Sequence, residues 1–220
     1  MSEKSNLLIF GQESTSKEIR ECVLDFYPDY YSEVITVIGN NDYPNFKSIF
    51  DCDLGNYLIQ HPKTKYIIGF SNLYLRIKMQ SKLKKFGIEA TNVIHPTAVI
   101  SSSAKMGRGN YVGAYVVISS NATIGDNNII NIGSSIGHDA VIGTNCIINP
   151  GVRISGNCII KNGTLIGANT VVFQGKTIGS ECLIDAMTYI DNDIPDFKLC
   201  TSKSQLKIYK NIIIPKQNGK

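Results

Sequence analysis

The first 90 residues alternate compact apolar runs with segments in which apolar residues recur at helical spacing. Three apolar runs, at 6–11, 34–39 and 65–70, have the length of buried strands, and each contains a glycine at or near its end. The apolar positions of the two predicted helices are Ile19, Cys22, Val23 and Phe26 in one, and Leu73, Ile77, Leu83 and Phe86 in the other. Strands that alternate with helices predict a small parallel sheet. We expect residues 1–95 to form a Rossmann-like βαβ domain.

The pattern changes at Val99, where a period of six residues begins. Sixteen consecutive hexads fill residues 99–194 without an insertion, and the second residue of every hexad is aliphatic, isoleucine in 13 of them. This period is typical of a left-handed parallel β-helix, in which each hexad is one side of a triangular coil and its second residue points inward. We therefore predict a left-handed parallel β-helix of hexapeptide repeats over residues 96–194, followed by a C-terminal tail at 195–220.

Three of the cysteines fit the hexad repeat. Cys146, Cys158 and Cys182 occupy the sixth position of their hexads, where other hexads carry alanine or threonine. Their spacing follows the coil and matches no zinc-binding pattern, and no CxxC pair occurs. We expect these thiols to pack in the core. The remaining cysteines have the character of reduced cytosolic thiols.

The net charge of +4 is spread along the chain without a concentrated basic block. Surfaces that read nucleic acid usually cluster Arg and Lys, so nucleic acid is not the expected partner, whereas an anionic small ligand stays open. No apolar run reaches the roughly 18 residues of a membrane span, and the N-terminus lacks the pattern of a signal peptide. We expect a cytoplasmic protein.

A histidine and an aspartate stand together inside the repeat, in the stretch SSIGHDAVIG. His138 is the fourth residue of its hexad, so its side chain should project outward near a corner of the coil. One turn of the coil, 18 residues, places it between Ser120 and Gly156, and the glycine leaves open space beside the imidazole. Asp139 could fix the tautomer of the ring, which would suit His138 to act as a general base. The alternative is a surface histidine without a role.

Other polar residues allow two interpretations each. Asn131 lies one coil before Asn149, so these amides either form a ladder along the coil or belong to a site. The three histidines of the chain are scattered, which argues against a three-histidine zinc site. In the first domain, the loop GQESTS and the strand end GFSN should meet at the carboxyl edge of the sheet, where such sheets bind ligands. Ordinary turn residues are the alternative there.

The layout as a whole resembles the bacterial sugar acyltransferase family. The resemblance extends over about residues 6–194 and rests on the βαβ domain, the junction IHPTAVIS and the stretch NIGSSIGHDAVIG within the β-helix. The family includes nucleotide-amino-sugar N-acetyltransferases of the bacillosamine, perosamine and viosamine pathways, and proteins similar to sialic acid O-acetyltransferases. The resemblance implies a homotrimer that transfers acetyl from acetyl-CoA, without a metal, to a nucleotide-linked 4-amino-4,6-dideoxysugar for surface glycan synthesis.

The resemblance also implies roles for individual residues. His138 corresponds to the general base and Asp139 to the acidic residue that orients it. The implied substrate-binding residues are Asn131, Gly11, Gln12, Glu13, Ser14 and Gly69. The implied acetyl-CoA-binding residues are Gly156, Ile147, Ala168 and Ala186, with the backbone amide of Gly156 directed at the thioester carbonyl.

Several positions differ from the family pattern. The loop GQESTS lacks the family's glycine-rich GxGGHA, Ile147 stands where a second histidine often contacts CoA, and FKLCTSKSQLK replaces the terminal VGNPAK. The candidates for the residue that reads the nucleotide base are Asn40, Asn41 and Asp42. Two alternatives stay open: a sugar O-acyltransferase and a non-catalytic β-helix scaffold. The intact His138–Asp139 pair argues against the scaffold.

Overall fold

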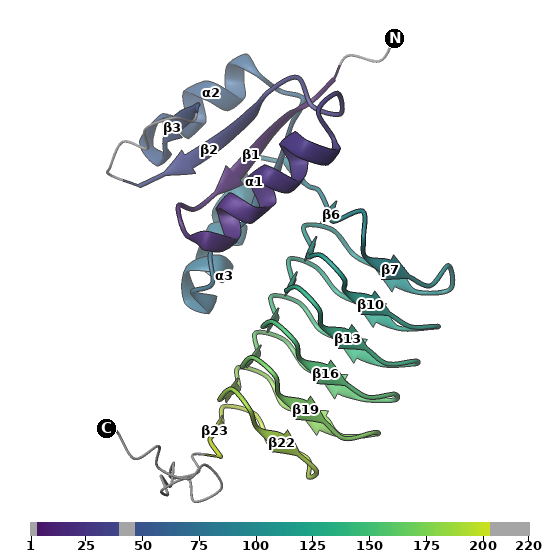
Figure 1. The fold of residues 1–220 in the computed structure, drawn as a ribbon. Helices are drawn as coiled ribbons and strands as arrows, with labels where there is room; N and C mark the ends of the chain where they lie inside the picture. The colour runs from purple at the N-terminus through teal and green to yellow at the C-terminus, as the bar shows by residue number, and fades with distance from the viewer. Residues whose placement is uncertain (1–3, 40–46, 203–220) are drawn as a thin grey trace, which may run out of the picture.

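The computed structural model of the chain describes residues 4–39 and 47–202. A small α/β domain sits beside one end of a long coil of stacked short strands (Figure 1). No helix in the described part of the chain has both the length and the apolar character needed to cross a membrane.

The α/β domain is built on one parallel sheet of order β3-β2-β1-β4-β5. Its strands are β1 (Asn6–Phe10), β2 (Val34–Ile38), β3 (Ser48–Phe50), β4 (Thr64–Ile68) and β5 (Glu89–Ala90). The helices are α1 (Ser14–Phe26), α2 (Leu54–Gln60) and α3 (Leu73–Lys85), with a short 3₁₀ turn, η1, at Asp51–Asp53. The three predicted strands and the Rossmann-like parallel arrangement are confirmed. Strands β3 and β5 are too short to leave a periodic signal in the sequence.

The two long helices differ in how well their apolar pattern predicts their buried face. In α1, Ile19, Cys22 and Val23 are buried as expected, whereas Phe26 is 48% exposed and packs edge-on against His95. In α3 the predicted face is correct only in part. Leu83 is fully buried and Leu73 is partly buried, as expected, whereas Ile77 and Phe86 are each 42% exposed. The other fully buried side chain of the helix is Arg76. The reason is that the arginine finds buried hydrogen-bond acceptors, described below, which no apolar pattern reveals.

The coil is the predicted left-handed β-helix, and its two-residue strands stack into three parallel faces (Figure 1). Face 1 consists of β6 (Val93–Ile94), β9 (Tyr111–Val112), β12 (Ile129–Ile130), β15 (Ile147–Ile148), β18 (Leu165–Ile166), β21 (Leu183–Ile184) and β23 (Leu199–Cys200). Face 2 consists of β7 (Val99–Ile100), β10 (Val117–Ile118), β13 (Ser135–Ile136), β16 (Arg153–Ile154), β19 (Val171–Val172) and β22 (Tyr189–Ile190). Face 3 consists of β8 (Lys105–Met106), β11 (Thr123–Ile124), β14 (Val141–Ile142), β17 (Ile159–Ile160) and β20 (Thr177–Ile178).

Strands of one face pair at a spacing of 18 residues, as in Ile118 with Ile136 and Ile136 with Ile154, except that β21 and β23 pair at a spacing of 16. The pairing runs from Val93 to Cys200, because β6 pairs with β9 and β23 pairs with β21. Coil-type pairing thus extends on both sides of the predicted segment 96–194. The use of 95 and 194 as domain boundaries stays a prediction.

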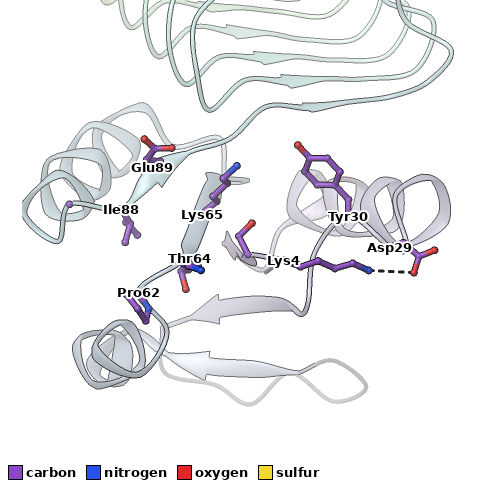
Figure 2. A pocket seen from close by; sticks show the side chains of 11 residues that line it. Lys4, Asp29, Tyr30, Pro62, Thr64, Lys65, Ile88 and Glu89 are labelled. Carbon is purple, nitrogen blue, oxygen red and sulfur yellow. Dashed lines mark ion pairs between the residues drawn. The ribbon is translucent and has the colours of Figure 1, made fainter. Parts of the chain in front are cut away.

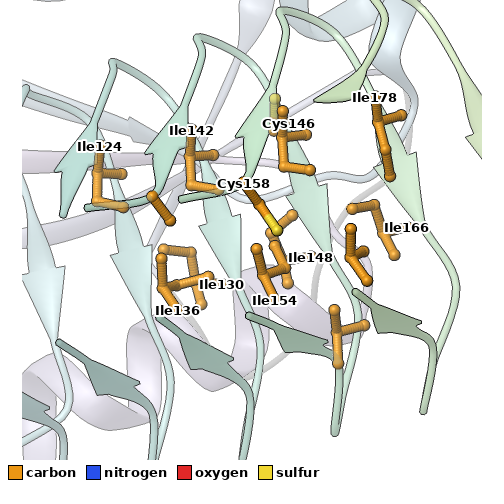
Figure 3. Packing of buried hydrophobic residues seen from close by; sticks show 14 of the residues in the cluster. Ile124, Ile130, Ile136, Ile142, Cys146, Ile148, Ile154, Cys158, Ile166 and Ile178 are labelled. Carbon is orange, nitrogen blue, oxygen red and sulfur yellow. The ribbon is translucent and has the colours of Figure 1, made fainter. Parts of the chain in front are cut away.

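The interior of the coil is a column of isoleucines from the second hexad positions (Figure 3). Burial of each such side chain contributes about 1.5–3 kcal/mol. Cys146, Cys158 and Cys182 lie in this column with no exposed surface, so the predicted core packing of these thiols is confirmed. Burial raises the pKa of the Cys146 thiol to about 11, which keeps it protonated at neutral pH.

The α/β domain packs against face 1 of the coil. Outward side chains of that face, including Tyr111, Ile129 and Ile147, share one buried cluster with Ile19 and Val23 of α1. These outward residues pack against the α/β domain, and this explains why the first position of the hexads on face 1 is apolar along this stretch. The domain and the coil therefore share a core in addition to being joined by the chain.

Arg76 connects the two parts through hydrogen bonds made by a buried side chain. Its side chain has no exposed surface and donates from Nη1 to the carbonyls of Ile68 and Phe70, at 2.9 Å each, and from Nη2 to the carbonyl of Asn127. Burial lowers the pKa of its guanidinium to about 10, so it stays charged at neutral pH. The end of β4 and a corner of the coil are thus held by one side chain.

Candidate active site

His138 lies where the chain turns from face 2 to face 3, two residues after the end of β13. The next residue, Asp139, has a left-handed backbone conformation with φ of 57°, which Asp and Asn tolerate better than most residues. This sharp corner brings the Asp139 carboxylate back to the imidazole, so that Nδ1 of His138 lies 2.8 Å from Oδ2 of Asp139. The two side chains are 52% and 46% exposed, and both are open to a ligand.

The contact determines which imidazole nitrogen can act as a base. An ionised carboxylate only accepts hydrogen bonds, so Nδ1 carries the proton in the neutral ring and Nε2 keeps its lone pair. The hydrogen bond from His138, followed by one from Asn121, lowers the pKa of the Asp139 carboxyl. Asp139 therefore stays ionised at neutral pH, as the predicted pairing requires.

Gly156 lies one coil further on, directly under the imidazole. A Cβ atom added at this position would stand 2.4 Å from Nε2 of His138 and 2.6 Å from its Cε1. The open space that the sequence predicts beside the histidine is therefore present, and only glycine provides it. Among the hydrogen bonds of the described residues, none uses the Gly156 N–H, which leaves this donor for a ligand.

A second group of predicted site residues lies at a different corner of the coil, between face 1 and face 2. Asn131 follows β12 there, and its Nδ2 lies 3.4 Å from Oδ1 of Asn149 one coil further on, which is the contact of an amide ladder. Ala168 and Ala186, also one coil apart, follow β18 and β21 at this same corner. Within one chain the structure does not bring these residues to His138, because the whole width of face 2 separates the two corners.

Ile147 is placed differently from the other residues expected to bind CoA. Its side chain is 1% exposed and belongs to the cluster shared by α1 and face 1. In this chain, the aliphatic residue at the position where the family often has a histidine packs the α/β domain onto the coil.

A large cavity of about 1110 Å³ lies at the carboxyl edge of the α/β sheet. It is lined by Gly11, Gln12 and Glu13 from the predicted loop, and by residues that follow β2 and β4 and that lie along α3. Glu13 also stabilises the edge itself, since its Oε2 accepts a hydrogen bond from the Ser71 N–H at 3.1 Å. The structure thus brings the two loops together, as expected for this edge of the sheet.

Ser14 and Gly69 do not line this cavity. Ser14 begins α1, and Gly69 lies against the first turn of that helix, where an added Cβ would stand 2.8 Å from Cα of Ser16. The glycine at 69 is therefore explained by the close approach of helix and strand. The predicted base-reading candidates Asn40, Asn41 and Asp42 lie outside the described residues.

Several residues that line the cavity were not singled out in the sequence. Lys78, Lys82 and Lys85 of α3 all line it, and Lys82 Nζ forms an ion pair with Oδ2 of Asp51 at 2.6 Å. Their spacing of four and three residues puts them on one face of a helix, and this was the signal available in the sequence. The carboxylates of Asp51 and Glu13 also line the cavity, so the three lysines leave an excess of one positive charge among the described lining residues.

A smaller cavity of about 580 Å³ lies at the opposite, amino edge of the sheet (Figure 2). Its walls carry both signs of charge, including the ion pair of Lys4 with Asp29 and the carboxylate of Glu89. Because the charges are mixed and largely solvated, this cavity does not define a site. No cluster of three or more metal-ligating side chains occurs among the described residues.

Comparisons with known proteins agree with this geometry. Residues 121–156 match the family described as bacterial transferase hexapeptide (six repeats). No curated protein sequence matches the chain at a significant level.

Among solved structures, the chain is similar to the acetyltransferase domain of PglB from Neisseria gonorrhoeae FA1090 in complex with acetyl coenzyme A. The TM-score is 0.81 at 26% identity, over 90% of this chain and 96% of that one. It is also similar to PerB from Caulobacter crescentus in complex with CoA and GDP-perosamine, with a TM-score of 0.81 at 26% identity over 89% of this chain and 93% of that one. WeeI from Acinetobacter baumannii AYE shares the fold, with a TM-score of 0.80 at 22% identity over 89% and 96% of the two chains.

Together, the hexad repeat, the β-helix and these matches support an acyltransferase. The predicted resemblance to sugar N-acetyltransferases is confirmed.

Proposed function

We propose that this chain is an acetyl-CoA-dependent N-acetyltransferase that acts on a nucleotide-linked 4-amino-4,6-dideoxysugar in the cytoplasm, for surface glycan synthesis. The observation that carries the proposal is the His138–Asp139 pair, with Nδ1 held at 2.8 Å from the carboxylate and Nε2 directed over Gly156. The similarity to PerB, whose solved complex contains CoA and GDP-perosamine, supports the choice of substrates.

The chemistry that these residues can perform is general base catalysis of acyl transfer. The Nε2 lone pair of His138 accepts the proton of the sugar amine as the nitrogen attacks the thioester carbonyl, and the C–S bond then breaks. Asp139 stabilises the imidazolium that results. The free N–H of Gly156 is available to the carbonyl oxygen while it carries negative charge. The proton taken by the imidazole can pass to the leaving thiolate, so all atoms and charges balance.

The cavity at the carboxyl edge of the sheet is the proposed acceptor site. Its volume of about 1110 Å³ exceeds the usual range for small-molecule sites, which leaves room for a nucleotide-linked sugar. Phe70 and Tyr74 offer flat apolar surface to a base or sugar ring, and the α3 lysines offer charge to a diphosphate. This arrangement replaces the glycine-rich loop that the sequence lacks.

Within one chain, however, this cavity and His138 cannot serve the same substrate. The α/β domain packs on face 1, and His138 stands at the corner between faces 2 and 3, which is opposite face 1 in a triangular coil. We therefore propose a homotrimer in which the cavity of one copy faces His138 of its neighbour. The same packing would join the Asn131 corner of one copy to the His138 corner of the next.

A subunit-mixing experiment tests this arrangement. One variant carries His138→Ala, and the other carries Lys78→Glu with Lys85→Glu, so that each alone lacks one half of the site. Co-expressed mixed trimers should regain roughly a quarter of wild-type activity. At each site, about half of the neighbouring copies supply an intact cavity and about half supply an intact His138, so about one site in four has both. A matched pair of His138→Ala with Asp139→Ala should regain nothing, since both changes affect the same corner. Absence of rescue in the first pair would contradict the shared site.

The function itself is tested with acetyl-CoA and a panel of UDP-, dTDP- and GDP-linked amino sugars. Release of free CoA with at least one amino sugar, and with none of the matching sugars that carry a hydroxyl at that position, is the expected result. Turnover of the hydroxyl sugars alone would show an O-acyltransferase instead. No CoA release from any acceptor would favour a scaffold and overturn the proposal.

A further inference from the structure

We propose that Asn121 is a positioning residue of this site, which acts on His138 through Asp139. The inference rests on the proposed function and extends the pair to a relay of three side chains. Nδ2 of Asn121 donates to Oδ1 of Asp139 at 3.2 Å, while the other oxygen, Oδ2, contacts Nδ1 of His138 at 2.8 Å. Each oxygen of the Asp139 carboxylate thus has its own partner, Asn121 for Oδ1 and His138 for Oδ2.

The second contact matters because Asp139 is exposed. A carboxylate held by one contact at the surface can rotate about its side-chain bonds, and exposed pairs of this kind are weakly held. Because Asn121 also donates to Oδ1, a rotation of the Asp139 carboxylate away from His138 breaks two hydrogen bonds instead of one. The carboxylate is thereby held in the rotamer that keeps the proton on Nδ1 and the lone pair on Nε2.

The coil places Asn121 where it can do this without any special loop. Asn121, Asp139 and Asn157 follow one another at 18-residue spacing, all with φ close to 58° (59°, 57° and 59°). They are the fifth residues of hexads at the corner between faces 2 and 3. Asn is well suited to this left-handed position, and Asp139 places a carboxylate between the amides of Asn121 and Asn157.

Asn121 is itself anchored from the other side. Its backbone N–H donates to Oγ of Ser103 at 3.0 Å, and Oγ of Ser103 lies 3.1 Å from Oγ of Ser101. The asparagine is thus fixed at its backbone by the preceding coil, and its amide group projects toward the following one. The relay therefore starts from a backbone position that is hydrogen-bonded to the preceding coil.

Asn121→Asp is the sharpest test, because it keeps the shape and the left-handed preference but replaces the donor with a like charge. It should lower kcat about two- to tenfold, the effect of one hydrogen bond, with little change in KM for acetyl-CoA. In an Asp139→Asn background the same change should alter kcat less than about twofold, because the residue through which Asn121 acts is already gone. Equal effects in both backgrounds would overturn the proposal.

A second measurement does not depend on the proposed reaction. Nitrogen-15 NMR of the His138 ring, in protein without substrate, should report the Nδ1–H tautomer in the wild type and a mixture in Asn121→Asp. Asn157→Asp, the same substitution one coil beyond Asp139, is the matched control and should keep the wild-type tautomer. An unchanged tautomer in Asn121→Asp would reject the relay. If the tautomer shifts but no acceptor turns over, the relay stands and the proposed function fails.

Discussion

Replacing His138 with alanine should lower kcat at least about a hundredfold, because the proton of the acceptor then has no positioned base. The fold should survive. The imidazole is 52% exposed and its side-chain partner in the described structure is Asp139, itself exposed, so the substitution leaves no buried polar group unpaired. Steady-state release of CoA, measured with saturating acceptor, gives kcat, and thermal unfolding checks the fold.

The matched control for this variant is His61→Ala. His61 follows α2 and stacks on Tyr57, far along the chain from the coil. The substitution also removes a histidine, but one in the α/β domain and not at the His138 corner. The kcat of this variant should therefore stay near that of the wild type. A His138→Ala protein that keeps near wild-type kcat would sink the assignment of the general base.

Gly156→Ala should also cost activity, by about tenfold or more, although the substituted residue carries no reactive group. The new methyl would stand 2.4 Å from Nε2 of His138, so the ring must swing away. That motion breaks its contact with Asp139 and misdirects the lone pair, which sacrifices part of the general base contribution. Alanine keeps the backbone N–H of residue 156. A loss of activity in this variant therefore reports the displacement of His138 and not the loss of that N–H donor.

Gly55→Ala in α2 is the control for adding a methyl group. There the nearest atom to the new Cβ is Cε1 of Phe86 at 3.9 Å, an ordinary contact, and alanine favours the helix. This variant should be as active and as stable as the wild type. Wild-type kcat in Gly156→Ala would mean that the ring does not occupy the position from which it acts.

The coil was predictable in detail because its physics repeats. Each hexad must direct one side chain into a narrow interior, so Ile118, Ile136 and Ile154 satisfy the same steric requirement and leave a strict period. The cysteines at sixth positions and the space beside His138 follow from the same register. Once the period is known, the neighbours of any residue are those at 18 residues on either side.

The α/β domain and the contacts between the parts were less predictable, because they depend on single events without a period. Arg76 would be assigned to solvent by any pattern of polar residues, yet it is buried and its Nη1 and Nη2 donate to three carbonyls. The family resemblance implies a CoA-binding role for Ile147, although the docking of α1 covers its side chain. The separation of Asn131 from His138 is also not evident from the sequence. The two residues are only seven apart in the chain, yet they lie at different corners of the triangular coil.

The bonds of Arg76 bear on how this protein can change over evolutionary time. All three acceptors are main-chain carbonyls, so the contact itself does not depend on which side chains stand at 68, 70 and 127. It does depend on the arginine. Consider this coil joined to a different α/β domain that has no arginine at the position of Arg76 in α3. The carbonyl of Asn127 would then be buried without the donor that it has here. The two modules are therefore expected to be inherited as a pair, even while their surfaces diverge.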